Sequence, residues 1–263
     1  MISISSELMQ AWISGLLWPL TRVLGLIAVS PILGHPAIPP TVKLGLGLMF
    51  TLIVIPTMPA LPVVDLMSLQ SLLILLQQLI IGVAMGLTMR IAFAAVELAG
   101  QLSGMTMGLG FASFYDPQSQ GQSTAISQLF GLLATLLFLA MNGHLLLFSA
   151  LAESFSTLPI QASETGGFSV IHVCSWGEKI FSAGVQLSLP IVAALLMTNI
   201  ALGILSRAAP QLNLFGIGFP VTLIVGFLAI AIALPGLATP LTQLFTEALN
   251  AIQKIGVPAV GMP

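Results

Sequence analysis

The stretch QQLIIGVAMGLTMRIAFAAVELAGQLSGMTMGLGFASFYDP, from Gln77 to Pro117, begins as an apolar run with regularly spaced small residues. It ends in residues typical of turns, because Gly110 is soon followed by Asp116 and Pro117. With the residues before it, the apolar run extends from about Leu66 to Gly110. A single helix of that length would exceed about 60 Å, roughly twice the hydrocarbon thickness of a bilayer. We therefore expect a long helix that bends back or projects beyond a membrane.

The composition of the whole chain also favours a membrane location. Of its 263 residues, 57% are hydrophobic and only 5% are charged, and the mean hydropathy is +1.10. A soluble domain carries about a quarter charged residues, and this chain has far fewer. The six lysines and arginines are scattered and the net charge is −2, so no nucleic-acid partner is expected.

Five further apolar segments accompany the long run, and β-strand alternation is not sustained in any part of the chain. Prolines predict kinks or breaks, above all Pro220, Pro235 and Pro240 in the last segment. A polar stretch from Gln161 to Ser169 predicts a loop. The chain is therefore predicted to be an all-α integral membrane protein of kinked helical hairpins. The five segments run from about Leu8 to Leu33, Val42 to Ile55, Thr124 to Leu158, Trp176 to Ala209 and Leu214 to Ile255.

Small residues recur every four positions in the long run, at Gly82 and Gly86 and again at Gly100, Gly104 and Gly108. Residues four apart share one face of a helix, where a missing side chain lets another helix approach closely. These glycines are predicted to pack helices, either within the chain or against other subunits.

Two charges, Arg90 and Glu97, also lie in this run and are predicted to be buried. They are about 10 Å apart along one helix face, so each needs a partner elsewhere. Alternatively, Arg90 extends its charged end to a membrane surface. Arg22 lies inside the first apolar segment, where a central charge costs about 2.5–3.5 kcal/mol on insertion scales.

Large flexible and aromatic side chains crowd the end of the run, at Met105, Met107, Phe111, Phe114 and Tyr115. Placed around a pore, such a cluster would exclude water and so block ions. It would also yield to a passing chain if the neighbouring glycines bend. The alternative is a re-entrant loop that packs into the core of this chain.

The sequence contains no recognisable catalytic, cofactor-binding or metal-binding motif, so neither an enzyme activity nor a cofactor is expected. Asn142, His144 and Glu153 are the only reactive side chains near one another, and His144 and Glu153 fall on opposite helix faces. A stand-alone solute transporter is an alternative that Arg90 and Glu97 would favour, but inverted repeats are lacking.

Four stretches, in register over almost the whole chain, resemble the FliR family of flagellar type III export-gate proteins. They are RVLGLIAVSPILGHPAIPPTVKLGLGL (Arg22–Leu48), the Gln77–Pro117 stretch quoted above, MNGHLLLFSAL (Met141–Leu151) and SRAAPQLNLFGIGFPVTL (Ser206–Leu223). The APQLN and GFP portions are closer to the flagellar branch than to the related export-apparatus subunits of injectisomes, which remain the alternative.

The resemblance implies a fold in which a FliP-like unit, residues 1–175, is fused to a FliQ-like hairpin, residues 176–263. The chain would be one subunit of a helical assembly with FliP and FliQ. A loop from about Met107 to Gln122 would plug the closed pore, with Phe111 and Phe114 directed into it. Met105 and Met107 would then stand next to a gasket of FliP methionines.

The resemblance also implies further partners and a location. Unfolded flagellar subunits would pass outward through the assembly, which would contact FlhB, FlhA, rod-base proteins and membrane lipid. The assembly would lie in the bacterial inner membrane at the flagellar basal body, with much of it on the periplasmic side.

Overall fold

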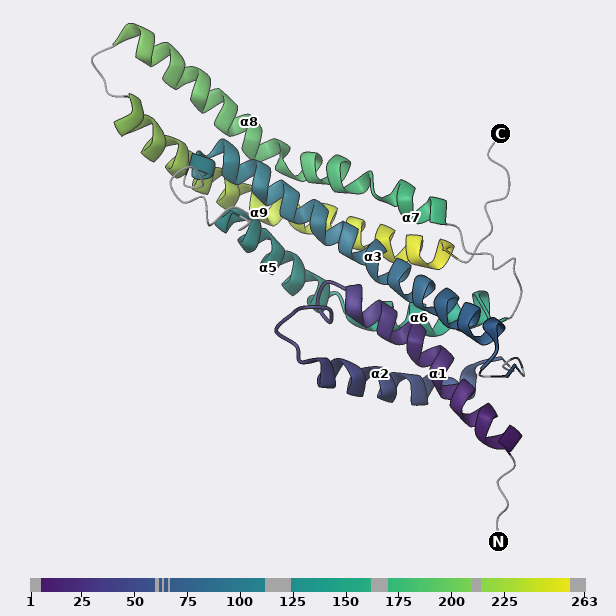
Figure 1. Ribbon diagram of the computed structural model, residues 1–263. Coiled ribbons are helices and arrows are strands. Elements are labelled where there is room, and N and C mark those ends of the chain that lie inside the picture. Colours follow the sequence, from purple (N-terminus) through teal and green to yellow (C-terminus); the bar gives the residue numbers. More distant parts are fainter. Residues whose placement is uncertain are drawn as a thin grey trace, which may run out of the picture. The chain divides into compact units, whose positions relative to one another are not determined.

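The computed structural model describes residues 6–59, 62, 64–65, 67–111, 124–161, 170–209 and 214–255, and the regular elements in these residues are all helical (Figure 1). The predicted all-α fold is confirmed for this part of the chain. The α-helices are α1 (Ser6–Val29), α2 (Pro40–Val54), α3 (Leu69–Thr106), α5 (Ala125–Ala140), α6 (Gly143–Thr157), α7 (Val170–Trp176), α8 (Lys179–Ala208) and α9 (Leu214–Lys254). Two 3-10 turns, η1 (Ile55–Thr57) and η2 (Leu109–Phe111), follow α2 and α3.

Several of these helices are long and apolar enough to cross a membrane. Within the described residues there are five such helical stretches, and α5 with α6 would add a sixth only if the pair forms one broken span. The 38 residues of α3 form one helix of about 57 Å, so the long run does not bend back. Its length exceeds the hydrocarbon core of a bilayer, which agrees with the expectation that it projects beyond a membrane.

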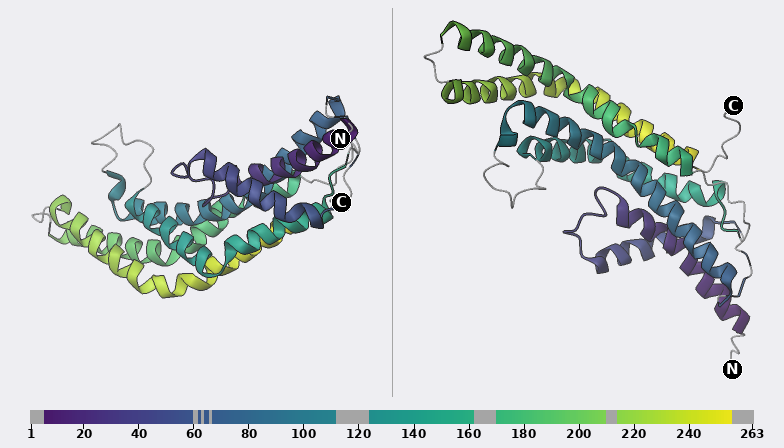
Figure 2. Two further views of the ribbon diagram at one scale, coloured as in Figure 1. Left: turned by 90° about the horizontal axis from the view of Figure 1, so that it is seen from below. Right: turned by 45° about the horizontal axis from the view of Figure 1, so that its top comes forward.

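Prolines shape the last helix without breaking it. The predicted breaks at Pro220, Pro235 and Pro240 are wrong, because α9 is continuous over its 41 residues. Each proline removes one backbone hydrogen bond and crowds the preceding turn, which bends a helix that remains intact. Figure 2 shows α9 curving along its length.

The apolar segment from Thr124 to Leu158 contains a break that the sequence analysis did not predict. α5 ends at Ala140 and α6 begins at Gly143. Between them Asn142 adopts a left-handed backbone conformation, with φ of 56°. Asparagine tolerates this conformation better than most residues, so the chain can leave one helix and start another within two residues.

The described chain divides into two compact units, each assembled from segments that are distant in sequence. Unit 1 takes in the residues up to Ile91, Asn142–Gly177 and the residues from Glu247. Unit 2 takes in Ala92–Met141 and Glu178–Thr246. The predicted division between residues 175 and 176 concerns resemblance to other proteins and stays a prediction.

Each unit has its own core. In unit 2 the rings of Phe93, Phe138 and Phe245 form a cluster with centroids 5.0–5.6 Å apart, which joins α3, α5 and α9. In unit 1 the core contains Trp18 and Arg22, both fully buried. Cys174, the single cysteine of the chain, lies in α7 and is exposed. Residues 162–169, most of the predicted polar loop, lie outside the described residues.

Candidate functional site

The end of α3 positions the predicted pore-closing cluster, and a glycine turns the chain there. The amide of Met107 donates to the Ser103 carbonyl at 3.0 Å, and the amide of Gly108 donates to the Met105 carbonyl at 3.0 Å. Gly108 has φ of 89°, a conformation that glycine adopts without steric cost. This geometry is that of a glycine ending a helix, and the chain continues into η2.

Met107 is held by α9. Its side chain is fully buried, and it fills the space beside Gly226. A Cβ atom on Gly226 would lie 2.5 Å from Cγ and 2.8 Å from Sδ of Met107. The hydroxyl of Thr222 donates to the Met107 carbonyl at 3.3 Å. Gly226 and Thr222, one helical turn apart, therefore hold Met107 on the surface of α9.

The chain that enters α5 is held on α3 in a similar way. Thr124 caps α5, since its hydroxyl oxygen accepts from the Ser127 amide at 3.2 Å. The same Thr124 lies against Gly104, where an added Cβ would meet its oxygen at 2.8 Å. One turn away, the Ser127 hydroxyl donates to the Glu97 carbonyl at 2.8 Å. Both chain ends that flank residues 112–123 are thus tied to helices of unit 2.

The other members of the predicted cluster lie in different surroundings. Met105 is 57% exposed, in contrast to Met107 two residues later. The backbone of Phe111 forms the last residue of η2. Phe114 and Tyr115 lie outside the described residues, so their predicted position in a pore stays a prediction.

Four of the five predicted packing glycines lie against other helices of this chain. A Cβ on Gly82 would overlap the Arg22 carbonyl of α1, and one on Gly86 would lie 2.8 Å from the Leu26 carbonyl. A Cβ on Gly100 would lie 2.6 Å from Cα of Ser127 on α5. With Gly104 against Thr124, these contacts give each glycine a role in packing within the chain. Gly108 differs, because it lies beyond the end of α3.

The predicted burial of Arg90 and Glu97 does not hold within this chain, because both side chains are exposed. The buried charge is Arg22, whose side chain has no exposed surface. A uniformly apolar run offers no polar face from which the buried side of a helix could be deduced. The sequence therefore offered no means of telling the exposed Arg90 and Glu97 on α3 from the buried Arg22 on α1.

Neutral groups from α3 and α6 surround the Arg22 guanidinium. Its Nε donates to Oε1 of Gln78 at 2.8 Å. One terminal nitrogen donates to the carbonyl of Ser154 at 2.8 Å and to its hydroxyl at 3.1 Å, and the other donates to the Leu158 carbonyl at 2.8 Å. The guanidinium carbon also lies 4.3 Å from the centre of the Phe155 ring. The two carbonyl acceptors, of Ser154 and Leu158, lie at the C-terminal end of α6, and the Ser154 carbonyl also accepts from the Leu158 amide at 2.9 Å.

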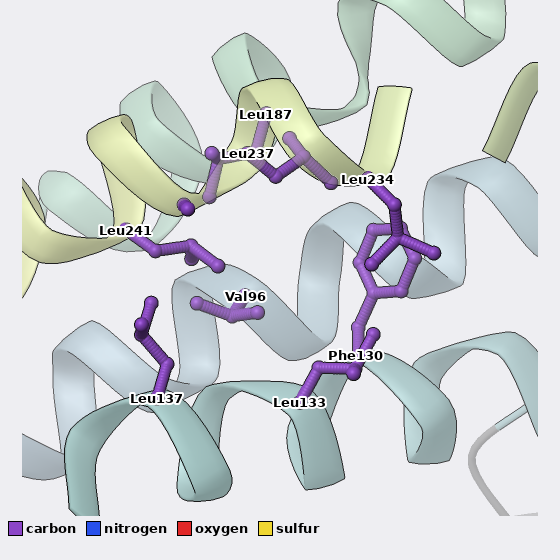
Figure 3. Close-up of a pocket in the computed structure, with 9 residues that line it drawn as sticks. Val96, Phe130, Leu133, Leu137, Leu187, Leu234, Leu237 and Leu241 are labelled. Carbon is purple, nitrogen blue, oxygen red and sulfur yellow. The ribbon is translucent and has the colours of Figure 1, made fainter. Parts of the chain in front are cut away.

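A cavity of about 160 Å³ in unit 2 is lined by hydrocarbon side chains alone (Figure 3). Leucines of α9 face Phe130 and leucines of α5, with Val96 of α3 between them. The lining leucines of α9 lie beside Pro235 and Pro240 in the sequence. The cavity offers no polar side chain for a metal or a charged ligand. In the described part of the chain no group of three or more His, Cys, Asp or Glu could hold a metal ion.

A family model described as bacterial export proteins, family 1, matches residues 13–248. The chain belongs to this family. The flagellar biosynthetic protein FliR of Escherichia coli (strain K12) is 42% identical over 255 residues, which cover 97% of each chain. FliR of Pectobacterium carotovorum subsp. carotovorum is 41% identical over the same share. FliR of Bacillus subtilis (strain 168) is 27% identical over 238 residues, 89% of this chain and 91% of the relative. These names describe flagellar biosynthesis rather than a chemical reaction.

For this member of the export family, sequence reasoning missed two contacts at the candidate site. Neither Gly226 nor Thr222 was singled out, because both lie far along the chain from Met107. A glycine and a threonine four residues apart in an apolar helix have many packing roles. Only the folded chain shows that both face the end of α3.

Proposed function

We propose that this chain is a core subunit of the flagellar type III export gate in the bacterial inner membrane. With FliP and FliQ it forms the channel through which unfolded flagellar subunits are exported. The observation that carries this proposal is the similarity to FliR over 97% of both chains, with relatives named for flagellar biosynthesis rather than for injectisomes. Similarity over nearly the full length favours a shared role as well as a shared fold.

The surface of the helices supports a role inside a larger assembly. Large apolar side chains are exposed along both α8 and α9. Sister subunits would cover part of this surface, including helical parts that project beyond the bilayer on the periplasmic side. Examples are Phe181, Met197, Ile204, Phe227 and Ile232, each more than half exposed.

The segment after α3 is proposed to close the pore of the resting gate. Phe111, Phe114 and Tyr115 supply bulk near a glycine turn, and Met105 is exposed at its base. Both ends of this segment are tied to the helices of unit 2, as a plug requires if it is to return to one place. Water-excluding side chains in a narrow pore block ions without a charged barrier.

The proposed division into a FliP-like and a FliQ-like part has support in the order of the helices. α7 ends at Trp176 and α8 begins at Lys179, close to the predicted boundary. α8 and α9 then run antiparallel, as a hairpin (Figures 1 and 2). FlhB, FlhA and rod-base proteins are the further partners that we propose for the assembled gate.

Aromatic truncation tests the pore-closing role. We expect that replacing Phe111 and Phe114 together by Ala leaves the complex with FliP and FliQ intact but lets ions through the closed gate, because the water-excluding bulk is removed. Ion conductance of membranes that contain the assembled gate measures the leak. Trp12→Ala, at an exposed aromatic position on α1 and away from the proposed subunit-covered surface of α8 and α9, serves as the control and should keep the closed-state conductance of the unmodified gate.

Wild-type conductance in the Phe111→Ala, Phe114→Ala variant would rule out the plug. A single purified chain that transports solute without FliP and FliQ would overturn the proposed function itself and favour a stand-alone transporter.

A further inference from the structure

Two methionines at the end of α3 have opposite surroundings. Met105 lies in the last turn of the helix and is 57% exposed. Met107 lies beyond the helix end, at a turn, and yet is fully buried. Residues that follow a helix end on a turn are usually accessible to solvent, so a specific contact must cover Met107.

Gly226 makes that contact possible and is unusual among the glycines of α9. A Cβ at Gly226 would come within 2.8 Å of three side-chain atoms of Met107, namely Cγ, Sδ and Cε. Around Gly218 and Gly236 of the same helix, an added Cβ would meet nothing within 4 Å. The thioether of Met107 therefore occupies the space that a side chain would fill if position 226 held any residue other than glycine.

Thr222 adds a polar link one turn before Gly226. Its single hydroxyl proton is shared between the carbonyl of Met107, at 3.3 Å from the oxygen, and the carbonyl of Phe219, at 3.0 Å. The carbonyl of a residue past a helix end has no partner within that helix, and leaving it unpaired in a buried place is costly. Thr222 is itself 92% buried, with 8% of its surface exposed.

We propose that Met107, Gly226 and Thr222 form a fixed anchor, here called the Met107 anchor, that holds the end of α3 on α9 during export. Met107 is then a positioning residue that stays in place, and the turn at Gly108, whose φ of 89° departs from helical geometry, sets the direction in which η2 leaves the anchor. The consequence for pore closure rests on the proposed function. The contact of Met107 with Gly226 and Thr222 is independent of it.

A cysteine pair tests whether the anchor exists and whether it stays closed. In a Cys174→Ser background, Met107→Cys combined with Gly226→Cys removes the crowding side chain and places two thiols where the present contact lies. Met107→Cys with Gly236→Cys is the matched control, because Gly236 has open space around it. Disulfide formation needs Cβ atoms about 3.8 Å apart, so we expect at least about a five-fold higher crosslink yield in the first pair.

Export by the crosslinked protein tests the fixed position. Secretion of flagellar subunits should proceed at the same rate in the oxidised and reduced pair, because the anchor does not open. Equal crosslink yields in the two pairs would overturn the contact. Loss of secretion on oxidation, with recovery on reduction, would overturn the fixed anchor by showing that Met107 leaves α9.

Alanine at Gly226 tests the positioning role. Gly226→Ala should displace Met107 and raise ion conductance through the closed gate, with FliP and FliQ still bound, whereas Gly236→Ala should not. Unchanged conductance in Gly226→Ala, in membranes where the phenylalanine variant leaks, would overturn this role. If the phenylalanine variant does not leak while the crosslink forms, the plug fails and the anchor stands, so the two failures are distinguishable.

Discussion

Arg22 places a full charge inside an apolar unit and surrounds it with uncharged acceptors. Its carbonyl acceptors, on Ser154 and Leu158, lie at the C-terminal end of α6. That end carries the negative side of the helix dipole, equivalent to roughly half an elementary charge. The guanidinium therefore caps α6, and the negative end of the helix dipole partly neutralises its charge. The planar fork reaches three residues at once, which the single ammonium of lysine cannot reproduce.

Removing this charge should destabilise unit 1. Arg22→Met removes the donors from which Oε1 of Gln78 and the Leu158 carbonyl accept in a buried place, and it should lower the free energy of unfolding by about 3 kcal/mol or more. Arg22→Lys should restore only part of the loss, because it keeps the charge without the fork. Thermal unfolding of the purified complex measures both. Arg90→Met, at an exposed position on α3, should change stability by only about 0.5 kcal/mol. Full rescue by lysine would show that the fork geometry is unimportant.

Arg22 also shows why the buried charge could not be located from the sequence. It is one of several cations inside or beside apolar runs, with Arg90 and Arg207. What distinguishes Arg22 is the set of acceptors that α3 and α6 bring to it from positions far along the chain. For Met107 the same holds, since the glycine that accommodates it lies in the last helix.

The helices were largely predictable as apolar segments, and their interruptions were not. The length of α3 follows from its unbroken apolar run, and the turn after it follows from the glycines. Proline is a weaker signal in a long apolar helix, because neighbouring helices and local adjustments satisfy the freed carbonyl. The break at Asn142 had a signal in the sequence, the turn dipeptide Asn142-Gly143, but it lies inside an apolar segment long enough to be one helix.

Asn142 offers a direct test of the join between α5 and α6. Glycine accepts a positive φ without steric cost, so Asn142→Gly should leave stability close to that of the unmodified chain. Alanine is strained there, and Asn142→Ala should lower the free energy of unfolding by about 1 kcal/mol. Because the Asn142 side chain is exposed, little packing is lost in either variant. Thermal unfolding compares them, and equal stability would show that the conformation of this residue does not fix the join.

Across the chain, exposed apolar surface can face either lipid or protein, and the two respond differently to added bulk. Lipid tails accommodate a larger side chain, whereas a packed protein interface loses about 1–3 kcal/mol when it is overfilled. Ile232 on α9 is 80% exposed and lies on surface that we propose to be covered by sister subunits.

Ile232→Trp should therefore weaken assembly without preventing insertion into the membrane. We expect less FliP and FliQ to co-purify with this variant than with the unmodified chain. The amount of the variant in the membrane fraction serves as the control for insertion. Undiminished co-purification would mean that this face of α9 meets lipid.

The exposed cysteine of α7 has a practical consequence. Because Cys174 is the single cysteine of the chain, a maleimide dye attaches at one place per copy. Stepwise photobleaching of complexes assembled from this chain, labelled after purification, and unlabelled partners would then count its copies in each complex, without altering a residue of the sequence.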